Sequence, residues 1–195
     1  SMPWNGKVDV DPDGDMHFPV GTVFVKHFKE GDVYHETRLL MHHEDGWAGY
    51  SYEWNEAQTD ATLLEVGKTV YLPSGTRWTY PTGSQCMVCH TEAAGRTLGP
   101  EMLQLQGPGP AGSDHGETTE NQLEWWLDHG MFGAGVTDDH DLPEIEGMPS
   151  PSDEDADIDD RARAYLHANC TMCHRPGGPQ HVGDYDFRFP ATFAE

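Results

Sequence analysis

The sequence is poor in basic residues and contains no long apolar run. It has 11 Lys and Arg side chains against 34 Asp and Glu side chains, which gives a formal net charge of −23. Binding to nucleic acid or to an anionic membrane relies on Lys and Arg, so the composition argues against both classes of partner. No apolar stretch reaches the roughly 18 residues that a membrane span needs. The acidic balance fits a basic protein partner, or a surface kept soluble by its charge.

Cysteine is also scarce, because the chain has four and all of them lie in two copies of one motif. The copies are Cys86-Met87-Val88-Cys89-His90 and Cys170-Thr171-Met172-Cys173-His174. Both read C-x-x-C-H, the attachment signature of haem c. Two thiols at this spacing reach the two vinyl groups of one porphyrin, and the adjacent imidazole binds its iron. The sequence therefore predicts two covalent haem c groups, with thioether anchors at Cys86, Cys89, Cys170 and Cys173 and proximal iron ligands at His90 and His174.

Other uses of these cysteines fit the spacing less well. A disulfide framework does not require a His after each second Cys, and a thioredoxin-like C-x-x-C needs a βαβ pattern that is absent. The two pairs of a four-Cys zinc site usually stand about 15–20 residues apart, whereas Cys89 and Cys170 are 81 positions apart (170 − 89). Iron with a fixed axial His performs one-electron chemistry, so a redox function is the first expectation.

The first residues, Ser1-Met2-Pro3-Trp4, have neither a basic segment nor an apolar core and do not read as a signal peptide. Covalent haem attachment is nevertheless normally completed outside the cytoplasmic membrane. We therefore expect a periplasmic or extracellular protein, represented here by a mature or recombinant fragment.

The region 1–82 is predicted to be a β-rich, sandwich-like domain. Residues alternate in character over 22–28 and 33–42, and aromatic residues occupy alternate positions over 48–54. Period-two alternation with β-branched and aromatic side chains is typical of strands. A hairpin is expected over 63–72 with its turn at Gly67-Lys68, and a last strand over 77–80 leads to Cys86.

After this region the pattern changes to short helices and Pro/Gly-rich loops. Helices are predicted over 85–94, over 119–129 with Thr119 as its cap, and over 153–170 with Ser152 as its cap. The Gly/Pro-rich segment 107–112 is expected to be a loop. The predicted fold class is α+β: a β-rich domain over 1–82, a mainly helical cytochrome module over 83–168, and an incomplete second haem segment over 169–195.

The parts that follow the first motif stand in a definite order. They are Leu98-Gly99-Pro100, a Trp-containing helix, Met148-Pro149, and a helix that includes Tyr165-Leu166. This order resembles that of class I cytochromes c, in which a Met in the loop before the last helix binds the iron opposite the proximal His. The resemblance makes Met148 the expected distal ligand of the first haem, with Met131 and His129 as the next choices.

The second haem has no obvious distal ligand, because only 21 residues follow His174 (195 − 174). His181 is too close to the motif to cross the porphyrin. An upstream residue reaches over, or the ligand is missing from this fragment, or another molecule supplies it. The upstream choices are His115, His129, His140 and Met131. A six-coordinate iron suits electron transfer, whereas an open position permits catalysis.

Two other patterns have plainer interpretations. The acidic stretch 9–15 opens like a calcium loop, but its twelfth position is Val20, where a bidentate Glu is needed. An acidic turn before a strand is the better interpretation. The aromatic row at Tyr50, Tyr52 and Trp54 is either packed in the core or a surface that binds a sugar polymer.

Longer blocks of sequence add a further indication. They are 18–23 (FPVGTV), 25–28, 36–40, 52–62, 85–91, 94–100, 161–166 and 175–178. These blocks resemble a family of exported bacterial dihaem c-type cytochromes with an N-terminal β-rich segment, whose members are longer at both ends. Some members stand beside, or are fused to, quinone-dependent sugar dehydrogenases. The resemblance implies that the chain accepts electrons from a carbohydrate-oxidising partner.

The expectation from these observations is an exported dihaem protein that transfers single electrons between redox protein partners. The alternative is a haem enzyme, peroxidase-like or oxidising another small molecule, with one open iron position. The sequence leaves open whether the chain is a catalyst, and it leaves the oligomeric state open.

Overall fold

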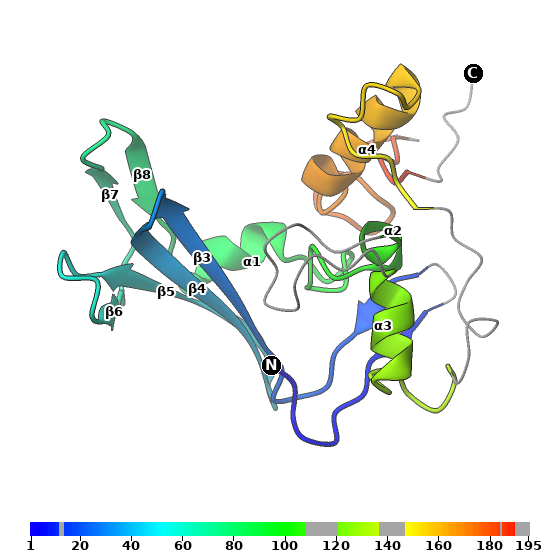
Figure 1. Ribbon diagram of the computed structural model, residues 1–195, viewed down its shortest axis with the longest axis horizontal. Coiled ribbons are helices and arrows are strands. Elements are labelled where there is room, and N and C mark those ends of the chain that lie inside the picture. The colour runs from blue at the N-terminus through cyan, green and yellow to red at the C-terminus, as the bar shows by residue number, and fades with distance from the viewer. Residues whose placement is uncertain (12–13, 108–120, 137–146, 184, 190–195) are drawn as a thin grey trace. The chain divides into compact units, whose positions relative to one another are not determined.

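The computed structural model describes residues 1–11, 14–107, 121–136, 147–183 and 185–189 (Figure 1). The chain forms two compact units. Unit 1 comprises 1–5 and 19–89, and unit 2 comprises 6–18 and 90–195. The chain passes from unit 1 to unit 2 within the first C-x-x-C-H motif, between Cys89 and His90.

Unit 1 is built on a four-stranded antiparallel sheet with the order β3-β4-β5-β6. Its strands are β3 (Val23–Glu30), β4 (Val33–His43), β5 (Gly46–Trp54) and β6 (Ala61–Leu63). The first three confirm the strands that alternation predicts. A register shift between Phe28 and Lys29 is a β-bulge, which changes the face on which the start of β4 places its side chains.

The predicted hairpin over 63–72 is wrong. Residues 61–63 join the main sheet as β6, whereas β7 (Lys68–Tyr71) pairs with β8 (Arg77–Tyr80) in a separate two-stranded sheet. The turn lies at Gly75, not at Gly67-Lys68. Gly75 has φ of 87°, a conformation that glycine adopts without strain, and its N–H donates to the carbonyl oxygen of Leu72 at 2.8 Å. The sequence prediction chose the wrong one of two glycine-containing turns.

The sandwich-like prediction for this region is also wrong, because one face of the main sheet packs on helix α1 (Gly83–Cys89) and a two-stranded hairpin, and not on a second sheet of comparable size. This helix face includes Glu36, Arg38, Leu40, Gly49 and Ser51, and it is covered by α1 and the β7–β8 hairpin. We call the opposite face the aromatic face. It carries Val23, Val25, His27, Thr37, Leu39, Met41, His43, Ala48, Tyr50, Tyr52, Trp54, Ala61 and Leu63. Unit 1, all of which is described, places no second layer on the aromatic face.

A buried carboxylate lies at the centre of the helix face. Glu36 is fully buried and accepts two bonds from Arg38, Nε to Oε1 at 2.7 Å and Nη2 to Oε2 at 2.9 Å. The hydroxyl of Ser51 and the indole N–H of Trp78, at 3.0 Å, also donate to it. Because a buried charge is tolerated only when it is paired and hydrogen-bonded, these donors fix the sheet to the β7–β8 hairpin.

Unit 2 combines a small β-ribbon with three helices. The ribbon is β1 (Asp9–Val10) with β2 (Met16–His17), and the helices are α2 (Met102–Leu105), α3 (Gln122–Asp128) and α4 (Ile158–Cys170). Asp11 N–H donates to the carbonyl oxygen of Asp15 at 2.9 Å, which confirms the acidic turn before a strand. The buried apolar residues of its described part are Val8, Met16, Phe18, Ala94, Met102, Leu103, Leu123, Phe132 and Ala164.

The mainly helical cytochrome module is a wrong prediction. The described chain is 28% strand and 19% helix, with three antiparallel sheets and four short helices. Each helix is shorter than predicted: α1 ends at Cys89, Asn121 caps α3, and Asp157 caps α4 in place of Ser152. Asn121 and Asp157 are themselves preferred capping residues, so residue type alone did not decide between them and the earlier Thr119 and Ser152. Thr119, His115, His140 and most of the 107–112 loop lie outside the described residues.

No helix in the described ranges has both the length and the apolar character that crossing a bilayer requires. This agrees with the absence of a long apolar run in the sequence.

We predict that Glu36→Gln destabilises the protein by about 2–3 kcal/mol, because Arg38 then loses its charged partner. The Arg38 side chain is 33% exposed, which keeps the loss below that of a fully buried pair. Urea unfolding followed by circular dichroism measures the effect. Glu44→Gln, in an exposed turn, is the control. Equal unfolding midpoints for the two variants would contradict the assignment.

Tyr80 should give the protein a distinct alkaline response. Burial raises the pKa of Tyr80 to about 12 from 10.0, and the nearby carboxylates of Glu53 and Glu36 add to the rise. The folded state therefore favours the neutral phenol, so this stabilisation is complete below pH 10.0 and is lost as the pH rises towards about 12. Tyr80→Phe should lose less stability over that interval than the wild type. Tyr71→Phe, at a 75% exposed position, should behave like the wild type.

Candidate haem-binding sites

A capping box starts the helix that carries the first motif. The Gln85 N–H donates to Oγ1 of Thr82 at 3.2 Å, and the Thr82 N–H donates to Oε1 of Gln85 at 2.8 Å. The resulting helix α1 places Cys86 and Cys89 three residues apart, on neighbouring positions of one helix side. Cys86 is half-buried and Cys89 is exposed. Both thiols are free, as two thioether anchors must be.

Helix α1 approaches the sheet at Gly49, in the middle of β5. A Cβ added to Gly49 would lie 2.6 Å from Cβ of Cys86 and 2.8 Å from its Sγ. A Cβ added to Gly83 would lie 2.8 Å from the carbonyl oxygen of Gly49. Cys86 of the first motif therefore packs directly against the backbone of Gly49, and any side chain at Gly49 would displace Cys86.

The environment of Cys86 does not activate its thiol. Burial raises the pKa of Cys86, the positive charge of Arg38 opposes the rise, and the negative charge of Glu36 adds to it. Nucleophilic cysteines have lowered pKa values that populate the thiolate. The surroundings of Cys86 therefore fit an anchoring thiol better than a catalytic nucleophile.

The imidazole of His90 is oriented by a backbone hydrogen bond. Its Nδ1 lies 2.6 Å from the carbonyl oxygen of Arg96, which is able only to accept, so Nδ1 carries a proton and Nε2 is the nitrogen that a neutral imidazole would offer to a metal. The backbone of Arg96 is in the left-handed region, with φ of 67°. Its Nη1 donates a hydrogen bond to the carbonyl oxygen of His90 at 3.0 Å. A metal-binding His typically donates its second ring N–H in this way. The arrangement fits a proximal iron ligand.

The second motif begins at the end of α4. The side chain of Asp157 accepts the Asp159 N–H at 2.8 Å and caps the helix, which ends at Cys170. The N–H groups of Cys173 and His174 then donate to the carbonyl oxygen of Cys170 at 3.1 and 2.9 Å. This turn keeps both thiols and the imidazole in one short loop, and neither Cys170 nor Cys173 forms a disulfide.

Residues on either side of the second motif tie it into unit 2. Arg175 is 7% exposed, and its Nη2 donates to Oδ2 of Asp15 at 2.7 Å. The N–H of Phe187 donates to the His174 carbonyl oxygen at 3.0 Å, and the two rings lie 5.1 Å apart. The motif is thus held from the β1–β2 turn and from the residues that follow it.

A direct contact joins the segment after the first motif to the second motif. The hydroxyl of Thr91, the residue after His90, donates to the carbonyl oxygen of Met172 at 2.7 Å. Met172 lies between the two cysteines of the second motif. A Cβ at Gly177 would lie 3.7 Å from that of Ala93. We call these four residues, which all belong to unit 2, the motif junction.

A buried pair of His167 and Glu101 lies close to the second motif in sequence, because His167 precedes Cys170 on the same helix. His167, on α4, is 5% exposed, and its Nδ1 accepts the N–H of Phe189 at 2.9 Å. Its Nε2 must then carry the proton, which it donates to Oε1 of Glu101. The pair connects α4 to the residues that begin α2.

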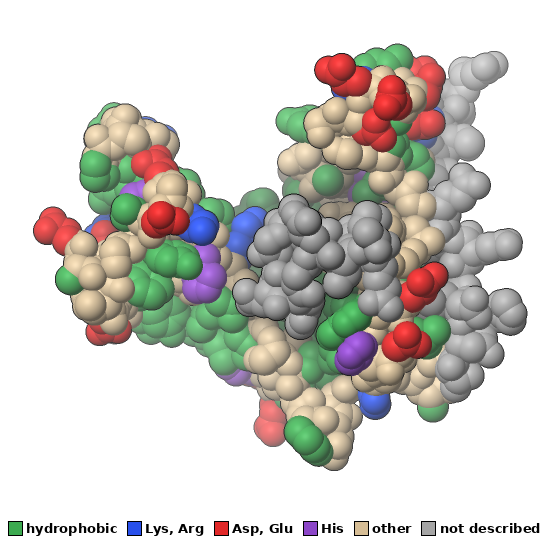
Figure 2. Space-filling model, in the orientation of Figure 1, with side chains coloured by type: hydrophobic (Ala, Val, Ile, Leu, Met, Phe, Trp, Pro, Cys, Tyr) green, Lys and Arg blue, Asp and Glu red, His purple; other side chains and the backbone are tan. Residues whose placement is uncertain are grey.

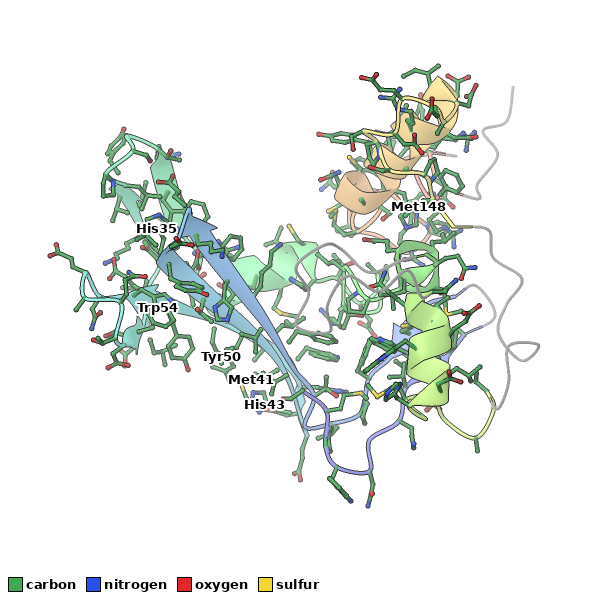
Figure 3. All side chains as sticks on the ribbon, in the orientation of Figure 1. His35, Met41, His43, Tyr50, Trp54 and Met148 are labelled. Atoms are coloured by element: carbon green, nitrogen blue, oxygen red, sulfur yellow. The ribbon has the colours of Figure 1, made fainter. Side chains whose placement is uncertain are left out.

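All three residues predicted as distal ligands lie within the described part of the chain. Met148 is half-buried, and its N–H lies 3.5 Å from the carbonyl oxygen of Leu103 on α2 (Figure 3). The backbone of Met131 makes two hydrogen bonds of 2.9 Å: its N–H donates to the carbonyl oxygen of Trp126, and its carbonyl oxygen accepts the N–H of Val8. His129 is exposed and stacks on Trp125 with 3.9 Å between ring centroids. Iron ligation by any of them stays a prediction.

The zinc alternative gains no support from the arrangement of donors. Within the described ranges, which contain all four cysteines, no three His, Cys, Asp or Glu side chains gather as a metal-binding group. Two cysteines outside any disulfide and one His in each motif instead match what haem c requires of a protein, since its iron is already held within the porphyrin. The residues present therefore fit two covalent haem groups.

The acidic character of the chain is concentrated in part around α4. Figure 2 shows Asp and Glu side chains gathered over this helix. They include exposed residues before and within its first turn, namely Asp153, Glu154, Asp155, Asp159 and Asp160. Carboxylates near a helix N-terminus are favoured by the helix dipole, so part of this charge stabilises α4.

Comparisons of the chain with protein-family models, with curated proteins and with solved structures found no match. The assignment therefore depends on the residues themselves. Sequence reasoning found both motifs but missed Gly49, Thr91 and His167. The signal for Gly49 was present, since a lone Gly within a strand pattern marks a close backbone approach. Thr91 and His167 carry no such signal, because their partners are distant in sequence.

We predict that Gly49→Ala lowers stability by about 1–3 kcal/mol through overpacking against Cys86. The intact mass should also show more chains without a group on the first motif. Gly99→Ala is the matched control, because a Cβ there meets nothing within 4 Å. A Gly49→Ala protein with the stability and mass distribution of the control would show that the Cys86 contact does not matter.

Proposed function

We propose that this chain is a dihaem c-type cytochrome that transfers single electrons between redox protein partners. When bound, haem c supplies one-electron oxidation and reduction at its iron. Cys86 and Cys89 would anchor one group and Cys170 and Cys173 the other. His90 and His174 would provide the proximal imidazoles.

The motif junction is the observation that carries this proposal. The bond from Thr91 to Met172 brings the residue beside one proximal His to within hydrogen-bond distance of the other motif's backbone. Thr91 is 8% exposed and Met172 is half-buried, so the contact is partly shielded from water. Two redox sites held this close suit a relay within one chain, whereas unrelated sites would have no need of this connection.

The surrounding residues support a fixed relay in chemical terms. The Arg96 carbonyl keeps the His90 ring in one tautomer and orientation, which favours a constant iron potential. Arg175 and Asp15 hold the start of the loop after His174. Small structural change on gaining or losing an electron favours fast transfer, and these contacts limit such change.

The partners and location follow from charge and chemistry. We propose that the protein works in the periplasm or outside the cell, where haem c is normally attached. A net charge of −23 favours steering towards a basic surface on the partner. By the family resemblance alone, the electron donor is a carbohydrate-oxidising dehydrogenase.

The test is production in a host competent in cytochrome maturation, followed by intact mass and spectroscopy. The wild type should carry the mass of two haem groups. The double variants Cys86→Ala/Cys89→Ala and Cys170→Ala/Cys173→Ala should each lose one. The dithionite-reduced spectrum should show low-spin iron that carbon monoxide does not change.

Three results would contradict the proposal. A colourless protein, or one containing zinc at the cysteines, would remove its chemical basis. Rapid carbon monoxide binding at one iron would favour the haem-enzyme alternative over a relay. A loss of both groups from each double variant would show folding failure, and circular dichroism of the same samples identifies that case.

A further inference from the structure

The aromatic face of the unit 1 sheet has a feature that electron transfer does not require. Figure 3 shows Met41, His43, Tyr50 and Trp54 projecting from one side of the sheet. Their neighbours at its edges are accessible, with Val25 53% exposed and Leu63 43% exposed. The α1 helix and the β7–β8 hairpin both lie on the opposite face.

The indole of Trp54 lies across the strands. Its Nε1 donates to Oγ1 of Thr37 at 2.8 Å, although the cross-strand neighbour of Thr37 on β5 is Tyr52. The ring must therefore extend from β5 over β4 to reach that hydroxyl. The same hydroxyl lies 2.7 Å from Nδ1 of His27, and Thr37 is only 9% exposed on a face without a second layer. The two rings are what cover it.

Other rings on this face are held in a similar way. The ring of Tyr34 lies 5.1 Å from that of Trp54 at 30°, an offset pair. The hydroxyl of Tyr50 lies 3.0 Å from Nε2 of His43, which directs the phenol along the sheet. Tyr34, Tyr50 and Trp54 are each half-buried, so only part of each ring is exposed and able to meet a ligand.

The aromatic face also lacks the charge that dominates the rest of the chain. None of the alternate residues of 23–27, 37–43, 48–54 and 61–63 that form it is Asp, Glu, Lys or Arg, in a chain with 34 acidic residues. The nearest charged group in contact is at the rim, where Nζ of Lys29 lies 5.8 Å from the centre of the Tyr34 ring. The absence of carboxylates favours an uncharged ligand.

We propose that this face binds a neutral polysaccharide. The axial C–H groups of a pyranose ring make an apolar surface that packs on a flat aromatic ring, and the Trp54–Tyr34 pair and Tyr50 provide such rings along one face. The hydroxyl groups at the edge of the sugar would remain in water or reach His27 and His43. The site is independent of the haem assignment and would place a redox protein on a carbohydrate surface.

The experiment measures retention of the intact protein on cellulose, chitin, xylan, mannan and starch. Trp54→Ala should weaken retention about ten-fold or more. Tyr34→Ala should also weaken it, and this second variant keeps the Trp54–Thr37 bond if loss of the indole disturbs folding. Trp4→Ala is the matched control, because Trp4 is a 98% exposed indole that belongs to none of the strands of the aromatic face. Circular dichroism and the absorbance spectrum check each variant.

Retention on at least one of these polysaccharides that Trp4→Ala keeps and the two aromatic-face variants lose would support the proposal. Failure of the wild type to bind any of the five would overturn it. Equal retention of all variants would overturn it too, because binding would then lie elsewhere. A wild-type dimer that Trp54→Ala converts to monomer would assign the face to self-association instead.

Discussion

The hydrogen bond between Thr91 and Met172 is the constraint on which the account of this protein depends. It joins two segments 81 positions apart in sequence (172 − 91) and, within unit 2, brings the segment after the first C-x-x-C-H motif against the second motif. This contact is the structural basis of the proposal that electrons pass between the two motifs. The buried His167–Glu101 pair and the Arg175–Asp15 pair hold the segments on either side.

Unit 1 serves the first motif in a different way, through close packing of backbone. The capping box at Thr82 and Gln85 starts α1, and Gly49 gives Cys86 room against β5. The buried Glu36 fixes the same sheet to its β7–β8 hairpin. One face of the sheet is thereby committed to the cysteine-bearing helix. The opposite, uncharged face remains for the sugar-binding role that its aromatic rings suggest.

The sequence predicted what depends on local pattern. Alternation found β3, β4 and β5, and the motif spacing found all four thiols and both imidazoles. The hairpin partner of β7 was missed because the choice between Gly67 and Gly75 depends on backbone conformation, not on composition. The helices were overestimated because Thr119 and Ser152 are of residue types that often cap helices, whereas the caps lie further along the chain at Asn121 and Asp157. The motif junction was out of reach, since a bond between Thr91 and a distant backbone carbonyl leaves no local signal.

The closeness of the two motifs is tested most directly by electron paramagnetic resonance of the fully oxidised protein. If both proposed haem groups are attached, the motif junction would hold their two ferric irons near enough to interact magnetically. The spectrum of the wild type should therefore differ from the sum of the spectra of the two variants that each keep a single motif. A wild-type spectrum equal to that sum, with two haem groups shown by mass, would contradict the account.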